Sequence, residues 1–225
     1  MAQHSKRYKN LVEKIDKEKE YTLKEGIAVI KETATTKFDS GIELHVKLGI
    51  DAIKGDQQVR NSVVFPHNAG KTQRVAVFTE NVDAAKKAGA DIVGGEELVK
   101  EIKASKKIDF DVAVAEPTMM KALGGVARIL GPKGLMPSPK EGTVTTDVVK
   151  AIEEIKKGKT SFKNDDSGNI HILVGRASFT EDQIQENIEL FLDVLKRSKP
   201  EGIKGVFILK VSLTSSMGPG VRVTI

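Results

Sequence analysis

The sequence predicts an α+β domain, formed by two separated parts of the chain, into which a smaller α/β domain is inserted. Near both ends of the chain, apolar and polar residues alternate, as in an antiparallel sheet with one face in contact with water. In the middle, short apolar runs alternate with helical segments, as in a parallel sheet that is covered on both faces. The length of 225 residues is compatible with one large domain or two modest ones.

The amino-terminal part predicts helices and a strand. Thr22 and Glu25 have the spacing of a capping box, and apolar residues then recur at helical spacing, so we expect a helix to begin there. A shorter helix is predicted over residues 11–19. Residues 42–50 alternate with the period of a half-buried strand. The polar positions of this strand are Glu43, His45 and Lys47.

The carboxy-terminal part predicts two more strands and a long helix. Strand patterns return at residues 169–177, after the turn formers 165–168, and at residues 205–214. The helix predicted over residues 181–196 has an apolar stripe, which packs most simply on the sheet and less simply in the groove of a partner. The result is an antiparallel sheet with helices on one face.

The middle of the chain has the alternating strand and helix pattern of a Rossmann-like α/β domain. The three expected strands cover residues 75–79, 91–95 and 110–115, and the helices that follow them cover residues 82–88, 96–104 and 118–123. Residues that favour turns lie at both boundaries between this pattern and the alternating pattern of the two ends. We therefore predict one discontinuous domain, 1–67 with 160–225, and an inserted domain, 68–159.

Composition limits the possible partners. A net charge of +5 and a sequence pI of about 9.2 are compatible with a nucleic-acid partner without requiring one. Trp is absent and aromatic residues make up 4% of the chain, so recognition by base stacking is not expected to dominate. No apolar stretch is long enough to span a membrane, and the charged start does not resemble a secretion signal, so we expect a cytoplasmic protein.

Signals for an enzyme are incomplete. Gly70-Lys71-Thr72 resembles the end of a Walker A loop, but Phe65 stands where the motif needs a glycine. Gly94-Gly95 follows a predicted strand without completing a dinucleotide-binding motif. The chain has no cysteine, and its four histidines lack short metal-ligand spacing. We expect no cofactor and no metal; a nucleotide-using enzyme built on the insert is the disfavoured alternative.

Two loops have features that stability alone does not explain. The connection 130–144 is rich in glycine and proline and would present Lys133 and Lys140, although a solvated crossover explains it too. In the loop 215–220, glycines allow close backbone approach, serine hydroxyls donate and accept, and Met217 can lie on a sugar or base. These groups suit recognition of ribose 2′-hydroxyls in a folded RNA.

At these residues the sequence resembles the family of the large-subunit ribosomal protein numbered one, the protein of the mobile stalk on the tRNA exit side of the bacterial ribosome. The resemblance covers essentially the whole chain. Its segments are TKFDSGIELHVKLGID, DQQVRNSVVFPHNAGK, LGPKGLMPSPKEGTV, KNDDSGNIHILVGRASF and KGVFILKVSLTSSMGPGVRV. It implies a split RNA-binding domain and an inserted Rossmann-like domain. It also implies binding of large-subunit rRNA, release of deacylated exit-site tRNA, and repression of the protein's own messenger RNA. We expect the protein to be a monomer when it is free of RNA.

Transferred by this resemblance, the RNA contacts fall on two groups of residues. Their members are Lys37, Phe38, Glu43 and Lys47 in the amino-terminal part, and Asp165, His171, Ser216, Met217 and Gly218 in the carboxy-terminal part. Gly41 stands where the family usually has a serine or threonine, Asp166 where lysine is frequent, and Ser216 where threonine is usual. No RNA role is assigned to the loop 130–144. A repressor of its own messenger with no ribosomal role remains a further alternative.

Overall fold

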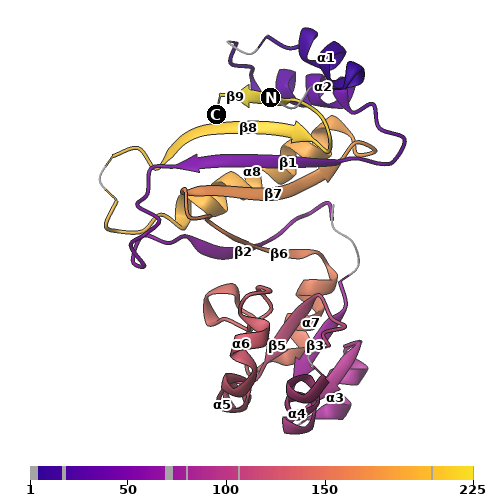
Figure 1. Ribbon diagram of the computed structural model, residues 1–225, viewed down its shortest axis with the longest axis vertical. Helices are drawn as coiled ribbons and strands as arrows, with labels where there is room; N and C mark the ends of the chain where they lie inside the picture. The colour runs from indigo at the N-terminus through magenta and orange to yellow at the C-terminus, as the bar shows by residue number, and fades with distance from the viewer. Residues whose placement is uncertain are drawn as a thin grey trace. The chain divides into compact units, whose positions relative to one another are not determined.

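The computed structural model describes residues 5–16, 19–68, 73–79, 81–105, 107–203 and 205–224. The chain divides into two compact units, Met1–Ala69 with Phe162–Ile225 and Gly70–Ser161 (Figure 1). Each unit has its own sheet and apolar core. No helix among the described residues is long and apolar enough to cross a membrane.

The first unit is built on a four-stranded antiparallel sheet in the order β7-β1-β8-β9. Its strands are β1 (Gly41–Leu48), β7 (Asn169–Arg176), β8 (Ile208–Ser215) and β9 (Gly220–Val223). The central strand β1 pairs on both sides with strands from the other end of the sequence. The antiparallel sheet predicted from alternating residues is therefore confirmed, with β9 as an additional edge strand.

Helices α2 (Leu23–Thr33) and α8 (Glu181–Arg197) contribute to the apolar core beneath the sheet, and α8 lies behind the sheet in Figure 1. Both begin with a capping box, at Thr22 and Thr180, in which the threonine hydroxyl accepts from a backbone N–H of the first turn. Every second residue of β1, from Ile42 to Leu48, is buried toward this core. Among the described residues of this unit, no helix covers the opposite face of the sheet (Figure 1).

Helix α1 is not where the sequence pattern placed it. It covers Lys6–Glu13, whereas a helix over residues 11–19 was expected. The side chain of Ser5 accepts a hydrogen bond from the backbone N–H of Tyr8 and so starts the helix earlier. Leu11 is its one buried residue, which explains why the apolar pattern was weak.

A two-stranded sheet joins β2 (Arg60–Val64) and β6 (Lys159–Lys163), and the sequence did not predict it. Both strands are short and carry mostly polar or half-exposed residues. Such segments lack the apolar alternation that identifies a strand, and their pairing joins distant parts of the sequence.

The second unit contains a parallel sheet in the order β4-β3-β5. The central strand is buried on both faces: Val75 and Val77 contact one apolar cluster, and Ala76 and Phe78 the other. The strands are β3 (Val75–Phe78), β4 (Ile92–Gly94) and β5 (Val112–Ala115). The helices are α3 (Val82–Lys87), α4 (Glu96–Ser105), η1 (Pro117–Met119), α5 (Met120–Leu123), η2 (Gly124–Val126), α6 (Ala127–Leu130), η3 (Pro139–Glu141) and α7 (Val148–Lys156).

The connection between Leu130 and Val144 is ordered by its own contacts. Leu135 and Met136 pack against the apolar cluster of the unit, and η3 turns the chain back toward β5. Lys133 is exposed, whereas the side chain of Lys140 lies outside the described residues. The loop therefore has a defined shape, which its own packing holds in place.

Candidate nucleic-acid interface

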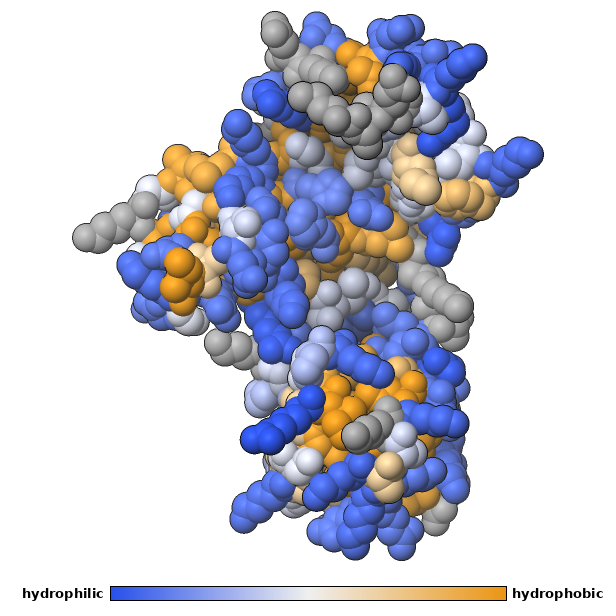
Figure 2. Space-filling view, viewed as in Figure 1, coloured by the Kyte–Doolittle hydropathy of each residue, from blue (hydrophilic) through white to orange (hydrophobic). Residues whose placement is uncertain are grey.

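The open face of the four-stranded sheet carries most of the site residues expected from the sequence. Glu43, His45 and Lys47 point away from the core on β1, opposite to the buried alternate positions. This face is turned toward the viewer in Figure 1, and Figure 2 shows that hydrophilic residues dominate it. A sheet with polar residues on an uncovered face provides a broad platform on which a ligand can lie.

At one end of this platform, two exposed apolar side chains flank the start of β1. Phe38 is 58% exposed and Met217 is 71% exposed. Backbone pairing joins their segments, since the Ser216 N–H donates to the Gly41 carbonyl over 2.9 Å. The Gly41 N–H donates to the Ser216 hydroxyl oxygen over 3.2 Å. Phe38 and Met217, distant in sequence, thus belong to one end of the sheet.

Met217 has a backbone conformation that is unusual for a residue with a side chain. Its φ is 62°, and it is the one non-glycine residue with positive φ that the structure describes. In this left-handed region a Cβ atom costs about 1–2 kcal/mol. The turn is closed by the Gly218 N–H, which donates to the Ser215 carbonyl over 2.9 Å. A strained residue whose apolar side chain remains in water is typical of a functional site.

Gly218 is required by close packing within this turn. A Cβ atom at this position would lie 2.2 Å from the Ser215 hydroxyl oxygen and 3.3 Å from the Ser215 carbonyl oxygen. Any side chain would therefore displace the turn itself. Substitution of Gly218 cannot separate a binding role from a structural role, whereas substitution of Met217 can.

Arg7 connects the turn to the segment that carries Phe38. Its guanidinium donates to the Met217 carbonyl over 2.7 Å and to the Thr35 hydroxyl over 3.3 Å. The three residues come from three distant parts of the sequence. Sequence reasoning missed Arg7, because no local pattern distinguishes it from the other basic residues of α1.

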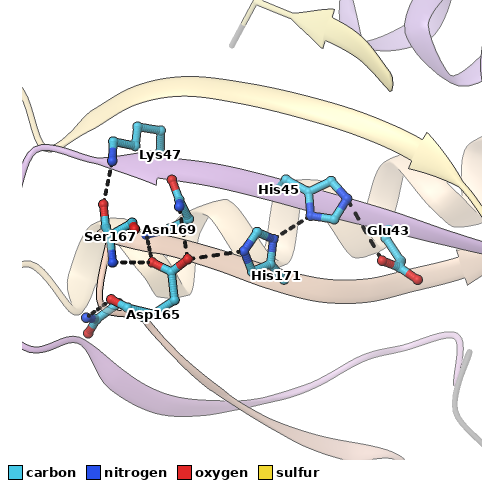
Figure 3. Close-up of polar contacts among 8 residues, drawn as sticks. Glu43, His45, Lys47, Asp165, Ser167, Asn169 and His171 are labelled. Carbon is cyan, nitrogen blue, oxygen red and sulfur yellow. Dashed lines mark hydrogen bonds and ion pairs between the residues drawn. The ribbon is translucent and has the colours of Figure 1, made fainter. Parts of the chain in front are cut away.

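The centre of the platform contains a pair of histidines. His45 and His171 are opposite residues of β1 and β7, and their Nδ1 atoms lie 2.6 Å apart (Figure 3). His45 is also 3.9 Å from the Glu43 carboxylate. Partial burial lowers the pKa of His45, and the neighbouring His171 lowers this pKa further. His45 was not among the expected contacts, although its polar position between Glu43 and Lys47 was a usable signal.

The other end of the platform is the turn before β7. The Asp165 carboxylate accepts from the backbone N–H groups of Ser167 and Asn169, at 2.9 and 2.6 Å, and from the Asn169 side chain (Figure 3). These bonds, first of all those from Asn169, hold the pKa of Asp165 at about 2. Asp165 therefore shapes the turn. The Lys47 ammonium donates to the Ser167 carbonyl of the same turn.

The expected contacts form a stripe along β1 rather than a single spot. From Gly41 to Lys47, the strand spans about 20 Å at about 3.4 Å per residue. Lys37 is exposed before β1, and Asp166 is exposed in the turn before β7. A Cβ atom at Gly41 would lie 2.6 Å from the Leu173 side chain, so a larger residue there requires Leu173 to move. This explains how glycine fits where a hydroxyl residue was the expectation.

The second unit offers no comparable site among the residues that the structure describes. At the carboxyl end of its parallel sheet, the Thr79 hydroxyl donates to the Glu116 carboxylate over 2.5 Å. Glu96 and Glu97 begin the helix after Gly94, so negative charge gathers where a phosphate would bind. Gly70-Lys71-Thr72 lies outside the described residues. In the described part of the chain, no group of three or more His, Cys, Asp or Glu could hold a metal ion.

Comparison with known proteins gives one consistent result. Residues 30–219 match the model of the ribosomal protein L1p/L10e family. The chain is 52% identical over 226 residues to the large ribosomal subunit protein uL1 of Mesoplasma florum, covering 100% of both chains. It is 49% identical to the protein of that name from Mycoplasma capricolum, over 99% of both chains. It is 48% identical to that of Thermosipho melanesiensis, over 99% of this chain and 97% of the relative.

Proposed function

The chain belongs to the ribosomal protein L1p/L10e family, and we propose that it is a non-enzymatic component of the large ribosomal subunit that binds folded ribosomal RNA. The names of its relatives support its place in the large ribosomal subunit, and the polar outer face of the sheet supports the binding of RNA. Binding rests on the shape of the RNA, its phosphates and its riboses.

One observation carries this proposal: Met217 has a strained backbone with φ of 62° and is 71% exposed, at the same end of the sheet as the exposed Phe38. Folding alone gains nothing from this arrangement. A folded RNA gives both side chains a partner, because a sugar or base surface removes them from water. The Ser216 hydroxyl and the Gly218 backbone lie in the same turn and suit ribose hydroxyls.

The remaining contacts extend along β1. Lys37 and Lys47 attract phosphates, whereas Glu43 accepts from ribose hydroxyls or base amino groups. His171 is the most exposed member of the histidine pair, with 53% of its side chain accessible, and is available to the ligand. Asp165 fixes the turn that positions these groups.

We assign the finer roles from the family resemblance. The discontinuous part, 1–67 with 160–225, is the RNA-binding domain, and the inserted part, 68–159, is a Rossmann-like domain. The RNA is the stalk segment of the large subunit, the protein assists release of exit-site tRNA, and it represses its own messenger RNA through a similar structure. Without RNA the protein is monomeric.

Filter binding of the full chain to a transcript of the stalk RNA tests the proposal. We expect Met217→Ala and Phe38→Ala to weaken binding at unchanged folding. Leu190→Ala is the matched control, because Leu190 is a 37% exposed apolar residue of α8, on the side of the sheet away from the platform. Unchanged affinity of both platform variants would refute the site.

Co-sedimentation separates the ribosomal role from a purely regulatory one. The chain should bind large subunits that lack their own copy of this protein. Binding to the messenger transcript without binding to large subunits would favour the messenger-specific repressor instead.

A further inference from the structure

A basic groove opens where β8 and β9 separate at one end of the sheet. Its volume is about 280 Å³. Glu20, the end of α8, the start of β8 and the end of β9 surround it. The lining residues that matter here are Glu20, Lys196, Lys210, Arg222 and Thr224.

Three cations line this groove without a recorded side-chain partner among the described residues. Lys196 comes from the last turn of α8, Lys210 from β8 and Arg222 from β9, and all three are exposed. Glu20 is the one carboxylate among the lining residues, so the lining carries a net charge of +2. This net positive charge attracts an anion into the groove.

Two of the three cations, Lys210 and Arg222, continue the outward row of the platform across the sheet, whereas Lys196 reaches the groove from the end of α8. Lys210 is opposite Lys47 on the neighbouring strand, and Arg222 is opposite Ser212, which is itself opposite His45. The outward row therefore runs from His171 on β7 to Arg222 on β9, which is three strand spacings or about 14 Å. A ligand that lies on the platform therefore meets two of the groove's cations, Lys210 and Arg222, on the same outward row.

We propose that this groove binds phosphates of the RNA backbone, so that the RNA interface extends to the edge strand β9. The inference rests on the proposed function and adds residues that neither the family resemblance nor the exposed apolar pair indicated. The planar guanidinium of Arg222 suits two phosphate oxygens at once, and the lysine ammonium groups act as point charges. Charge complementarity and continuity with the platform favour RNA over an acidic protein segment.

The salt dependence of RNA binding tests the groove. We expect Arg222→Gln and Lys196→Gln each to reduce the slope of log K against log salt by about 0.7–0.9, because one fewer counterion is released. At 0.1 M salt the same loss corresponds to roughly 5- to 8-fold weaker binding. Filter binding to the stalk transcript at four salt concentrations measures both quantities on the full-length protein.

Two controls separate this effect from other causes. Arg197→Gln removes the same charge from the adjacent exposed position of α8, outside the groove lining, and should leave the slope unchanged. Met217→Ala should weaken binding at every salt concentration without changing the slope. Because all substituted side chains are exposed, thermal unfolding of each variant should match that of the unaltered chain.

The outcomes distinguish the groove from the platform. RNA binding by the unaltered chain, with equal slopes for Arg222→Gln, Lys196→Gln and Arg197→Gln, overturns the groove while the proposed function stands. Absence of binding by the unaltered chain overturns both. Reduced slopes for the two groove variants alone support the phosphate site.

Discussion

Met217 should lower the stability of the fold through its backbone conformation and strengthen RNA binding through its side chain. Two substitutions at this residue separate these two effects. Met217→Ala and Met217→Gly both remove the apolar side chain beyond Cβ from a residue that is 71% exposed in the free protein. They differ in the backbone: alanine keeps the cost of the left-handed conformation at φ of 62°, and glycine removes it.

The stability difference follows from two opposing contributions. Removing the left-handed cost gains about 1–2 kcal/mol, and the larger conformational freedom of glycine in the unfolded chain loses about 0.5–1 kcal/mol. The glycine variant should therefore be more stable than the alanine variant by roughly 0.5–1 kcal/mol.

The effect on binding is calculated from exposure. Full burial of a methionine side chain contributes about 1.5–3 kcal/mol, and the 71% that remains exposed leaves about 1–2 kcal/mol for the RNA contact. Both variants should therefore bind RNA roughly 5- to 30-fold more weakly.

Urea denaturation and filter binding measure the two quantities. The chain has two tyrosines and no tryptophan, and both Tyr8 and Tyr21 lie in the unit that contains Met217. Tyrosine fluorescence therefore follows unfolding of that unit alone. Equal stability of the alanine and glycine variants would refute the strain, and RNA binding as tight as that of the unaltered chain would refute the contact.

Three further predictions concern the same unit. Asp165→Asn should destabilise the turn before β7. Hydrogen bonds from Asn169 lower the pKa of Asp165 to about 2, so its stabilising contribution is complete above a pH of about 4 and is lost as the pH falls toward 2. Acid titration of the unaltered chain and of the variant measures this difference. Protonation of His45, whose pKa is lowered, should destabilise the fold as the pH falls below about 6.5, and urea midpoints of His45→Gln should lack this contribution. Ser215→Ala should raise the free energy of unfolding by about 1 kcal/mol, because the Ser215 hydroxyl is buried and has no hydrogen-bond partner among the described residues. A lower urea midpoint for this variant would contradict the prediction.

Elements with a strong local pattern were predicted correctly. The capping box at Thr22 and the apolar spacing after it gave helix α2, and strict alternation gave β1. Continuous apolar runs gave the three parallel strands of the second unit. In each case the burial of a residue follows from its own position in a short repeat, so the neighbouring sequence suffices.

Elements with weak patterns were missed or displaced. Helix α7 was not predicted, although Asp147 caps it and Val148, Ile152 and Ile155 face the core. Strands β2 and β6 are short and polar, and they are stabilised by pairing with each other. Helix α1 begins five residues earlier than expected, at Lys6, because Ser5 caps it.

The sequence by itself determined the alternating pattern of the antiparallel sheet, the apolar runs of the parallel sheet, the polar outer positions of β1 and the unusual composition of the turn at Met217. These features depend on neighbours a few residues away. Only the tertiary structure decided that Ser216 pairs with Gly41, that Arg7 binds the Met217 carbonyl, and that Arg222 ends the row that begins at His171. These contacts join residues up to 210 positions apart. No local period encodes which distant strands become neighbours, since that choice depends on how the whole core is buried.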